Sequence, residues 1–210
     1  CSLNNVSVTV GGNAQVSTAQ SRFGGGSAYF NGTSDALRFP EVPLGAADFT
    51  IECWIKTDST VQYAQIIGNE FSGAGFTLLI NHDTNSDGKL VLYINGNKVV
   101  QTNTPDVSDN EWHHVALTRS GSLFTVWVDF ISRATGTSNA SMTGYGGVMS
   151  VGRNDNYAPR NMVGYINDLR ITAGVVRDIS ETPIESFKGA STLLVTSSTL
   201  PYMVKYSPDN

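Results

Sequence analysis

The sequence predicts an all-β fold in which two antiparallel sheets stack as a sandwich. Apolar and polar side chains alternate with a period of two in residues 48–56, 112–119 and 123–129, which places one row of each strand in a core. The 210 residues include 21 glycines and many Ser, Thr and Asn, a composition typical of short strands joined by turns. No apolar pattern with the helical period of 3.6 extends beyond one turn, so helix should be minor.

Fourteen strands are expected in chain order. They lie near residues 6–10, 14–18, 27–31, 35–39, 49–57, 64–68, 75–81, 89–94, 97–102, 112–119, 123–129, 148–152, 162–171 and 192–197. The strongest hairpin signal is Asn95-Gly96, because a two-residue turn with positive φ matches the twist of paired strands. Residues 105–110 and 133–147 are polar and are expected to be loops that shape a binding surface. A helical turn is expected only near 183–187.

Several of these segments carry a family resemblance. The stretches FTIECWIK (49–56), WHHVALTRSG (112–121) and LFTVWVD (123–129) resemble strands of laminin G-like jelly-roll domains with the concanavalin A-like fold. Residues 23–32 resemble the entry strand of that family, and 150–153 with 162–171 resemble its closing pair. The resemblance covers about residues 8 to 187. It implies a two-sheet antiparallel jelly-roll β-sandwich.

The end of the chain adds two expectations. Gly174-Val175-Val176-Arg177, with Pro183 and Phe187, resembles the tail of versions of the domain in bacteriophage virion proteins. We expect a jelly-roll domain over 1–187 and a carboxyl-terminal strand and tail over 188–210. The apolar segment 191–195 either takes a vacant sheet edge, in its own sandwich or in a neighbouring subunit, or it links to a following module.

Composition excludes some classes of partner. A hydrophobic content of 40% lets the chain bury one core, so one domain is expected. The net charge of −5 is not accompanied by a basic cluster, so nucleic acid is not an expected partner. No stretch reaches the roughly 18 to 20 apolar residues that span a bilayer. Cys53 falls in the apolar row of its strand and is expected to be a buried thiol, which leaves the cellular compartment open.

The sequence does not favour catalysis. Glycoside hydrolysis needs two carboxyl groups about 5 to 9.5 Å apart, one of them with a raised pKa. The run Glu-x-Asp-x-x-Glu, usual in laminarinase-type sandwiches, is absent, and Glu52 and Asp129 are expected to be solvated surface carboxylates. His113 and His114 are adjacent in one strand and should face opposite sides of the sheet, so they cannot converge on one atom. We therefore expect no enzymatic activity.

Calcium is the one candidate cofactor. Asp83, Asn85 and Asp87 place oxygen ligands at alternate positions before Gly88, as in the first half of a calcium loop, but Ile94 occupies the position of the final acidic ligand. An ordinary hairpin turn explains this segment equally well. The family resemblance suggests a second position, Asp168, where many concanavalin A-like sandwiches hold a structural calcium. A turn cap or a salt bridge with Arg170 is the alternative for Asp168.

Candidate sugar ligands are aromatic and amide side chains. A flat ring stacks on the apolar face of a pyranose at little entropic cost. Trp54 and Trp127 fall in the rows that face away from the core, although packing under a covering segment is the alternative for both. The Gly- and Asn-rich loops supply four further candidates, which are Tyr145, Asn154, Asn156 and Tyr157. The asparagines could equally cap turns.

These observations favour a non-catalytic binding module. The phage-like closing segment suggests a virion surface protein, as a capsid decoration or in a tail fibre, that attaches to other virion proteins and adheres to cell-surface polysaccharide. A secreted bacterial carbohydrate-binding or adhesin module is the alternative, followed by a glycoside hydrolase. The sequence leaves open whether the chain forms a homo-oligomer.

Overall fold

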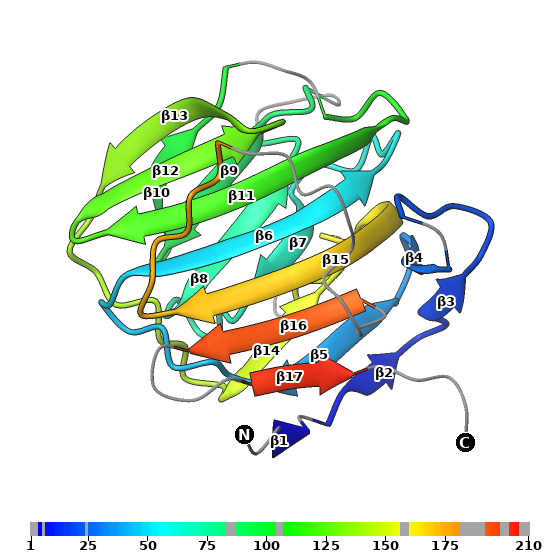
Figure 1. Ribbon diagram of the computed structural model, residues 1–210, viewed down its shortest axis with the longest axis horizontal. Coiled ribbons are helices and arrows are strands. Elements are labelled where there is room, and N and C mark those ends of the chain that lie inside the picture. The colour runs from blue at the N-terminus through cyan, green and yellow to red at the C-terminus, as the bar shows by residue number, and fades with distance from the viewer. Residues whose placement is uncertain are drawn as a thin grey trace.

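The protein is a sandwich of two β-sheets (Figure 1). The computed structural model describes residues 4–5, 7–23, 25–82, 87–103, 107–155, 160–180, 192–197 and 202–205. These residues form seventeen strands and no helix, which confirms the all-β prediction. Accordingly, this part of the chain contains no helix long and apolar enough to cross a membrane.

The larger sheet has ten strands. Its main path runs β1-β17-β16-β15-β6-β11-β12-β13, with β4 beside β15 and β3 beside β4. The bounds are β1 (Asn4–Asn5), β3 (Gln15–Ser17), β4 (Ser27–Asn31), β6 (Phe49–Lys56), β11 (Trp112–Ser120), β12 (Leu123–Val128), β13 (Ile131–Thr137), β15 (Val163–Ala173), β16 (Thr192–Ser197) and β17 (Tyr202–Lys205).

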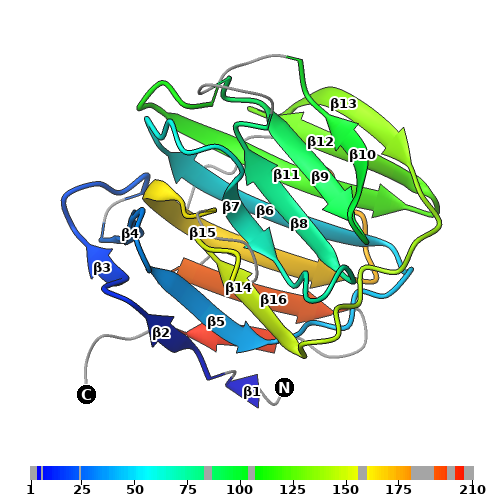
Figure 2. The same ribbon diagram turned by 180° about the vertical axis from the view of Figure 1, so that it is seen from behind.

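The smaller sheet has seven strands in the order β10-β9-β8-β7-β14-β5-β2, and Figure 2 shows it from its own side. Its members are β2 (Thr9–Gly11), β5 (Ala36–Pro40), β7 (Ala64–Gly68), β8 (Phe76–Ile80), β9 (Leu90–Ile94), β10 (Asn97–Gln101) and β14 (Val148–Val151). Neighbouring strands of this sheet are all antiparallel within the described residues.

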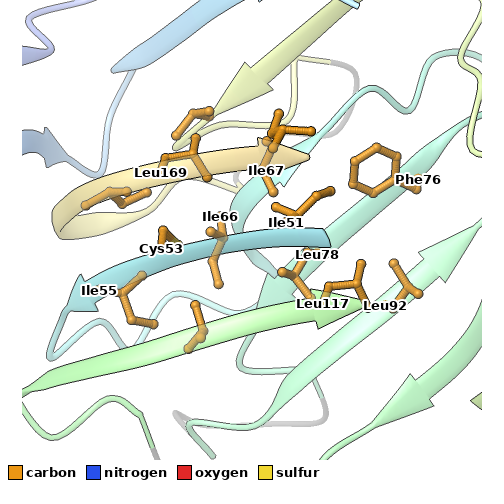
Figure 3. Close-up of a cluster of buried hydrophobic side chains, with 14 of the residues drawn as sticks. Ile51, Cys53, Ile55, Ile66, Ile67, Phe76, Leu78, Leu92, Leu117 and Leu169 are labelled. Atoms are coloured by element: carbon orange, nitrogen blue, oxygen red, sulfur yellow. The ribbon is translucent and has the colours of Figure 1, made fainter. Parts of the chain in front are cut away.

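Alternating side chains of the two sheets meet in one core (Figure 3). In β6, Ile51, Cys53 and Ile55 point inward and are almost fully buried. Leu117 of β11 lies opposite Ile51, and Leu78 of β8 comes from the facing sheet. The expectation of a buried Cys53 thiol is confirmed, and burial raises its pKa above the ordinary range. Burial of each aliphatic side chain in this core stabilises the folded state by about 1.5–3 kcal/mol.

Two local predictions had different outcomes. The Asn95-Gly96 hairpin is confirmed, because both residues have positive φ (50° and 73°) and join β9 to β10. The expected loop over 133–147 is wrong in its first part, where β13 pairs with β12. β13 is an edge strand with mostly exposed or half-buried side chains, so the apolar alternation that marks other strands is missing from it.

The carboxyl-terminal strands extend the larger sheet. β16 pairs in parallel with the second half of β15, β17 pairs with β16, and β1 pairs in parallel with β17. β4 occupies the same edge of β15 along its first half. The division at 187/188 stays a prediction, and the helical turn expected at 183–187 lies outside the described residues.

Candidate functional site

A hollow of about 400 Å³ lies over the face of the seven-stranded sheet that points away from the core. Its floor comes from β5, β7 and β14, and its walls come from the loops that follow β7 and flank β14. The lining residues are Arg38, Gln65, Gly68, Asn69, Glu70, Phe71, Tyr145, Gly146, Val148, Ser150, Asn154 and Asp155. A volume of this size is typical of a small-ligand site.

Two exposed aromatic rings line this hollow. Tyr145 is 79% exposed and Phe71 is 46% exposed, which is unusual for side chains of this size. Phe71 lies close to the backbone of Gly146, the residue after Tyr145, since a Cβ at Gly146 would lie 3.5 Å from the Cβ of Phe71. The two rings therefore offer apolar surface to a bound molecule from neighbouring loops.

The loop that carries Tyr145 is held on both sides. The Glu41 carboxylate accepts hydrogen bonds from the backbone N–H of Gly144 (2.8 Å) and from the Asn69 side chain (2.6 Å). The Glu41 backbone N–H donates to the carbonyl of Gly147 (2.9 Å). Because these bonds flank Tyr145, the ring is mounted on an ordered loop, which reduces the entropy that a ligand must remove on binding.

Arg38 and Asp155 form a bidentate ion pair in this hollow. Nε of Arg38 donates to Oδ2 of Asp155 and Nη2 donates to Oδ1, both at 2.5 Å. The Arg38 hydrogen bonds hold the pKa of Asp155 below its ordinary value, so this carboxylate is ionised at neutral pH. Arg153 lies 3.3 Å from the same carboxylate, so the pair adds fixed charged groups to the lining of the hollow.

Buried polar contacts fix the floor. The Gln65 side chain donates to the carbonyls of Ser150 (3.0 Å) and Arg153 (2.8 Å), and it accepts from the Thr77 hydroxyl (2.8 Å). Gly68 leaves the floor without a side chain, and a Cβ there would lie 2.6 Å from the carbonyl oxygen of Phe76. The floor is thus both polar and rigid.

The predicted sugar ligands separate onto two faces. Tyr145 and Asn154 line the hollow, although the side chain of Asn154 is buried. Trp54 and Trp127 lie on the opposite side of the molecule, on the outer face of the ten-stranded sheet. Asn156 and Tyr157 fall outside the described residues. Sugar binding by any of these residues stays a prediction.

Trp54 lies on the outer face of its sheet as predicted, but it packs under a covering segment, the alternative given for it, and is only 5% exposed. The Arg22 guanidinium lies 4.4 Å from its ring, and Phe23 packs against it edge-on at 5.8 Å. Asn167 holds this covering loop by accepting from the Arg22 backbone N–H (3.0 Å). Trp127 is half-buried and donates to the Thr118 hydroxyl (3.0 Å), so it keeps an accessible part.

The expectation for Glu52 is corrected, because it is 2% exposed and not solvated. The segment 174–180, which we call the crossing segment, passes over β6 on the outer face of the ten-stranded sheet (Figure 1). Its Arg177 forms an ion pair with Glu52, and Arg170 of β15 lies 3.7 Å from the same oxygen. The carboxylate is therefore neutralised in place and is inaccessible to a substrate.

The two adjacent histidines face opposite ways, which confirms the prediction. His114 stacks on Phe130 at 4.5 Å and lies 3.3 Å from Glu52. Burial lowers the pKa of His114 to about 4, and the positive charge of Arg170 acts in the same direction. His113 lies between Asp129 (2.8 Å) and Asp109 (3.0 Å), whose hydrogen bonds raise its pKa to about 9. Asp129 is thus a turn residue that orients His113.

The calcium candidates stay predictions. Asp83 and Asn85 lie outside the described residues, and Asp87 forms an ion pair with Lys89 at 3.3 Å. Asp168 is buried in an irregular part of β15 with φ of 49°. Within the described ranges, no three His, Cys, Asp or Glu side chains gather as a metal site would require. A site at Asp168 would depend on backbone carbonyls.

The sequence indicated neither Arg38 nor Phe71 as a site residue, and it offered Asp155 only as part of the Asn- and Asp-rich run 154–156. Arg38 is the polar residue of an alternating strand, and Asp155 lies 117 residues further along in an Asn- and Asp-rich loop. Only the fold brings them together. The alternation around Arg38 and the Asn154-Asp155 pair were visible in the sequence, but nothing in it indicated their pairing.

Two facing sheets of mainly antiparallel strands make this chain a β-sandwich protein. The Laminin_G_3 family model, described as the concanavalin A-like lectin/glucanases superfamily, matches residues 31–178. The chain belongs to this family.

Solved structures share the fold. Domain 4 of AbnA, a GH43 extracellular arabinanase of Geobacillus stearothermophilus solved with arabinotriose, has a TM-score of 0.60 and 15% identity over 83% of this chain and 86% of that chain. The botulinum neurotoxin serotype D binding domain has a TM-score of 0.59 and 16% identity over 84% of this chain and 46% of that chain. A candidate carbohydrate binding protein of Bacteroides ovatus has a TM-score of 0.56 and 17% identity over 87% of this chain and 48% of that chain.

One curated relative is similar in sequence. The "Sushi, von Willebrand factor type A, EGF and pentraxin domain-containing protein 1" of Rattus norvegicus is 30% identical over 108 residues. The match spans 50% of this chain and 3% of that protein. The similarity therefore concerns one segment of a much longer protein.

Proposed function

We propose that the protein is a non-catalytic carbohydrate-binding module whose site is the hollow over β5, β14 and β7. The observation that carries the proposal is the exposed Tyr145 ring, held on an ordered loop beside the bidentate Arg38–Asp155 pair. The ring stacks on the apolar face of a sugar, and the ion pair hydrogen-bonds its hydroxyl groups.

The ionised state of Asp155 supports binding without turnover. A glycosidase needs one carboxyl group that stays protonated near neutral pH. The pKa of Asp155 is lowered by Arg38, which is the wrong direction for a general acid. Glu52, the other carboxylate considered from the sequence, is buried on the opposite sheet.

Two proteins of similar fold support the same proposal. The AbnA domain was solved with arabinotriose, and the Bacteroides ovatus protein is a candidate carbohydrate binding protein. Both share the fold of this chain at low sequence identity, so they suggest sugars as a ligand class and not a particular sugar.

We place this module on the surface of a bacteriophage virion, as a capsid decoration or in a tail fibre. The placement is supported by the resemblance of residues 174–177 to the tail of virion versions of the domain. There it attaches to other virion proteins and adheres to cell-surface polysaccharide, with weak single sites that gain strength from multivalent display. The alternative is a secreted bacterial module, which the extracellular arabinanase domain favours.

Affinity electrophoresis on arabinan, xylan, mannan, galactan and β-glucan tests the binding proposal. Wild type should be retarded by at least one of these polymers, and Tyr145→Ala should lose the retardation while keeping the wild-type melting temperature. Trp127→Ala is the matched aromatic control on the other sheet and should bind like wild type. Retardation lost in Trp127→Ala but kept in Tyr145→Ala would move the site to the ten-stranded sheet.

Two further measurements address turnover and location. The retained polymer should release no reducing sugar on prolonged incubation, and release would refute the non-catalytic proposal. Mass spectrometry of purified virions encoded by the source genome should find the chain. A gene that lies among bacterial genes for exported proteins would instead support the secreted module.

A further inference from the structure

A second hollow of about 240 Å³ lies next to the first on the same sheet face. Its lining residues are Tyr63, Glu70, Leu79, Tyr93, Gly96 and Arg160. Leu79 and Tyr93 belong to β8 and β9 and alternate with core residues, so they point away from the core. The second hollow therefore covers the strands that follow β7 in the sheet.

Glu70 lines both hollows, which makes them neighbours and not separate sites. The first hollow covers β5, β14 and β7, and the second covers β8 and β9, which come next in the sheet order. Four interstrand steps of about 4.8 Å give the combined path a length of roughly 19 Å across the strands. That length exceeds one sugar ring and suits several linked units.

The second hollow has its own fixed aromatic surface. His82 packs against Tyr63 edge-on at 5.4 Å and stacks with Tyr93 at 5.6 Å. The Tyr93 hydroxyl hydrogen-bonds Nε2 of His82, and the Arg160 guanidinium lies 5.1 Å from the Tyr63 ring. These contacts hold two half-buried tyrosine rings in place, so a ligand that stacks on them pays little ordering entropy.

The charged residues along the two hollows balance. Arg38 and Arg160 supply two cations, while Glu70 and Asp155 supply two carboxylates. A charged polymer would gain no net attraction from this lining, whereas hydroxyl groups find both donors and acceptors. The lining thus favours neutral sugars over uronic acid or sialic acid chains.

We infer that the two hollows form one groove that binds a linear, neutral oligosaccharide running across β5, β14, β7, β8 and β9. The inference rests on the proposed function and deepens it, because it names a chain and not a single terminal sugar as the ligand. Tyr145 and Phe71 bind one end of the chain, and Tyr93 with Tyr63 bind the other.

Calorimetric titration with a length series tests this inference. The probes are the arabino-, xylo-, manno- and β-1,3-gluco-oligosaccharides from monosaccharide to hexasaccharide. Wild type should bind at least one pentasaccharide about tenfold more tightly than its disaccharide. Tyr145→Ala should weaken both lengths, while Tyr93→Ala should remove the gain of the pentasaccharide and leave disaccharide binding unchanged.

Controls separate this inference from the proposed function. Tyr165→Ala, a half-buried tyrosine of the ten-stranded sheet, should keep the wild-type length dependence. If Tyr93→Ala does not fold, Arg160→Ala replaces it with the same expected result. Equal affinity for monosaccharide and hexasaccharide, or a length gain that survives in the folded second-hollow variant, would overturn the inference alone. No binding of any probe by wild type would overturn the proposed function together with it.

Discussion

Replacing Glu52 with glutamine keeps the shape of a buried side chain but removes the negative charge that two guanidinium groups surround. Arg177 of the crossing segment forms an ion pair with Glu52, and Arg170 lies 3.7 Å from it. After the change, both cations lie beside a neutral amide on the outer face of the ten-stranded sheet. The crossing segment then loses its main electrostatic contact with β6.

The size of the effect follows from burial. Removing one partner of a buried ion pair costs about 3–5 kcal/mol. Glu52 is 2% exposed, but the Arg177 side chain is 31% exposed and can recover part of its hydration. We therefore expect a loss of about 3 kcal/mol in the free energy of unfolding, at the lower end of that range. For a chain of this size the melting temperature should fall by about 6–12 °C.

Urea unfolding and calorimetry measure this loss directly. Glu111→Gln, at an exposed carboxylate, is the matched control and should change stability by less than about 0.5 kcal/mol. The pair Glu52→Gln and Arg177→Met should be less destabilised than the sum of the two single variants, since they share one contact. A Glu52→Gln variant as stable as Glu111→Gln would refute the assignment of Glu52 as the anchor of the crossing segment.

Three further predictions concern stability. The pKa of His113 is raised from its ordinary 6.5 to about 9, so its contribution is complete below about pH 6.5 and lost as pH rises through 9. Wild type should therefore lose its advantage in stability over His113→Gln on urea unfolding between those values, and a constant difference would contradict the stabilisation of charged His113 by Asp129 and Asp109. Gly152→Ala should lower the free energy of unfolding by about 3 kcal/mol, because φ is 82° and a Cβ would lie 2.2 Å from the Phe30 ring. Gly147→Ala should lower it by about 1 kcal/mol, because φ is also positive but no atom lies within 4 Å of the added Cβ. Deleting residues 190–210 should lower the melting temperature, because β15 loses its pairing with β16. An unchanged melting temperature and oligomer size would show that β16 does not stabilise the sheet.

The strands could be predicted from sequence wherever two-residue periodicity was strong. Residues 49–56 and 112–120 alternate because one side of each packs on the opposite sheet, and both appear as strands. β13 could not be predicted in this way, because an edge strand is defined by backbone pairing with β12 and carries no apolar row.

The candidate site was only partly accessible from sequence. Tyr145 could be chosen because a large aromatic in a Gly-rich loop has few places to bury itself. Glu52 was predicted to be solvated and Trp54 to be either exposed or covered, and the structure shows both covered, by the crossing segment and by the loop at Arg22 and Phe23. Periodicity identifies the side of a strand that faces away from the core, but it does not identify what lies on that side.

The most direct test of sugar binding at the seven-stranded sheet is a backbone amide NMR titration with the oligosaccharides described above. The account predicts the largest shift changes at Gly68 to Phe71, Gly144 to Ser150 and Asp155, with smaller changes at Tyr93. Shift changes confined to the amides around Trp127 on β12, or no change anywhere at saturating sugar, would contradict it.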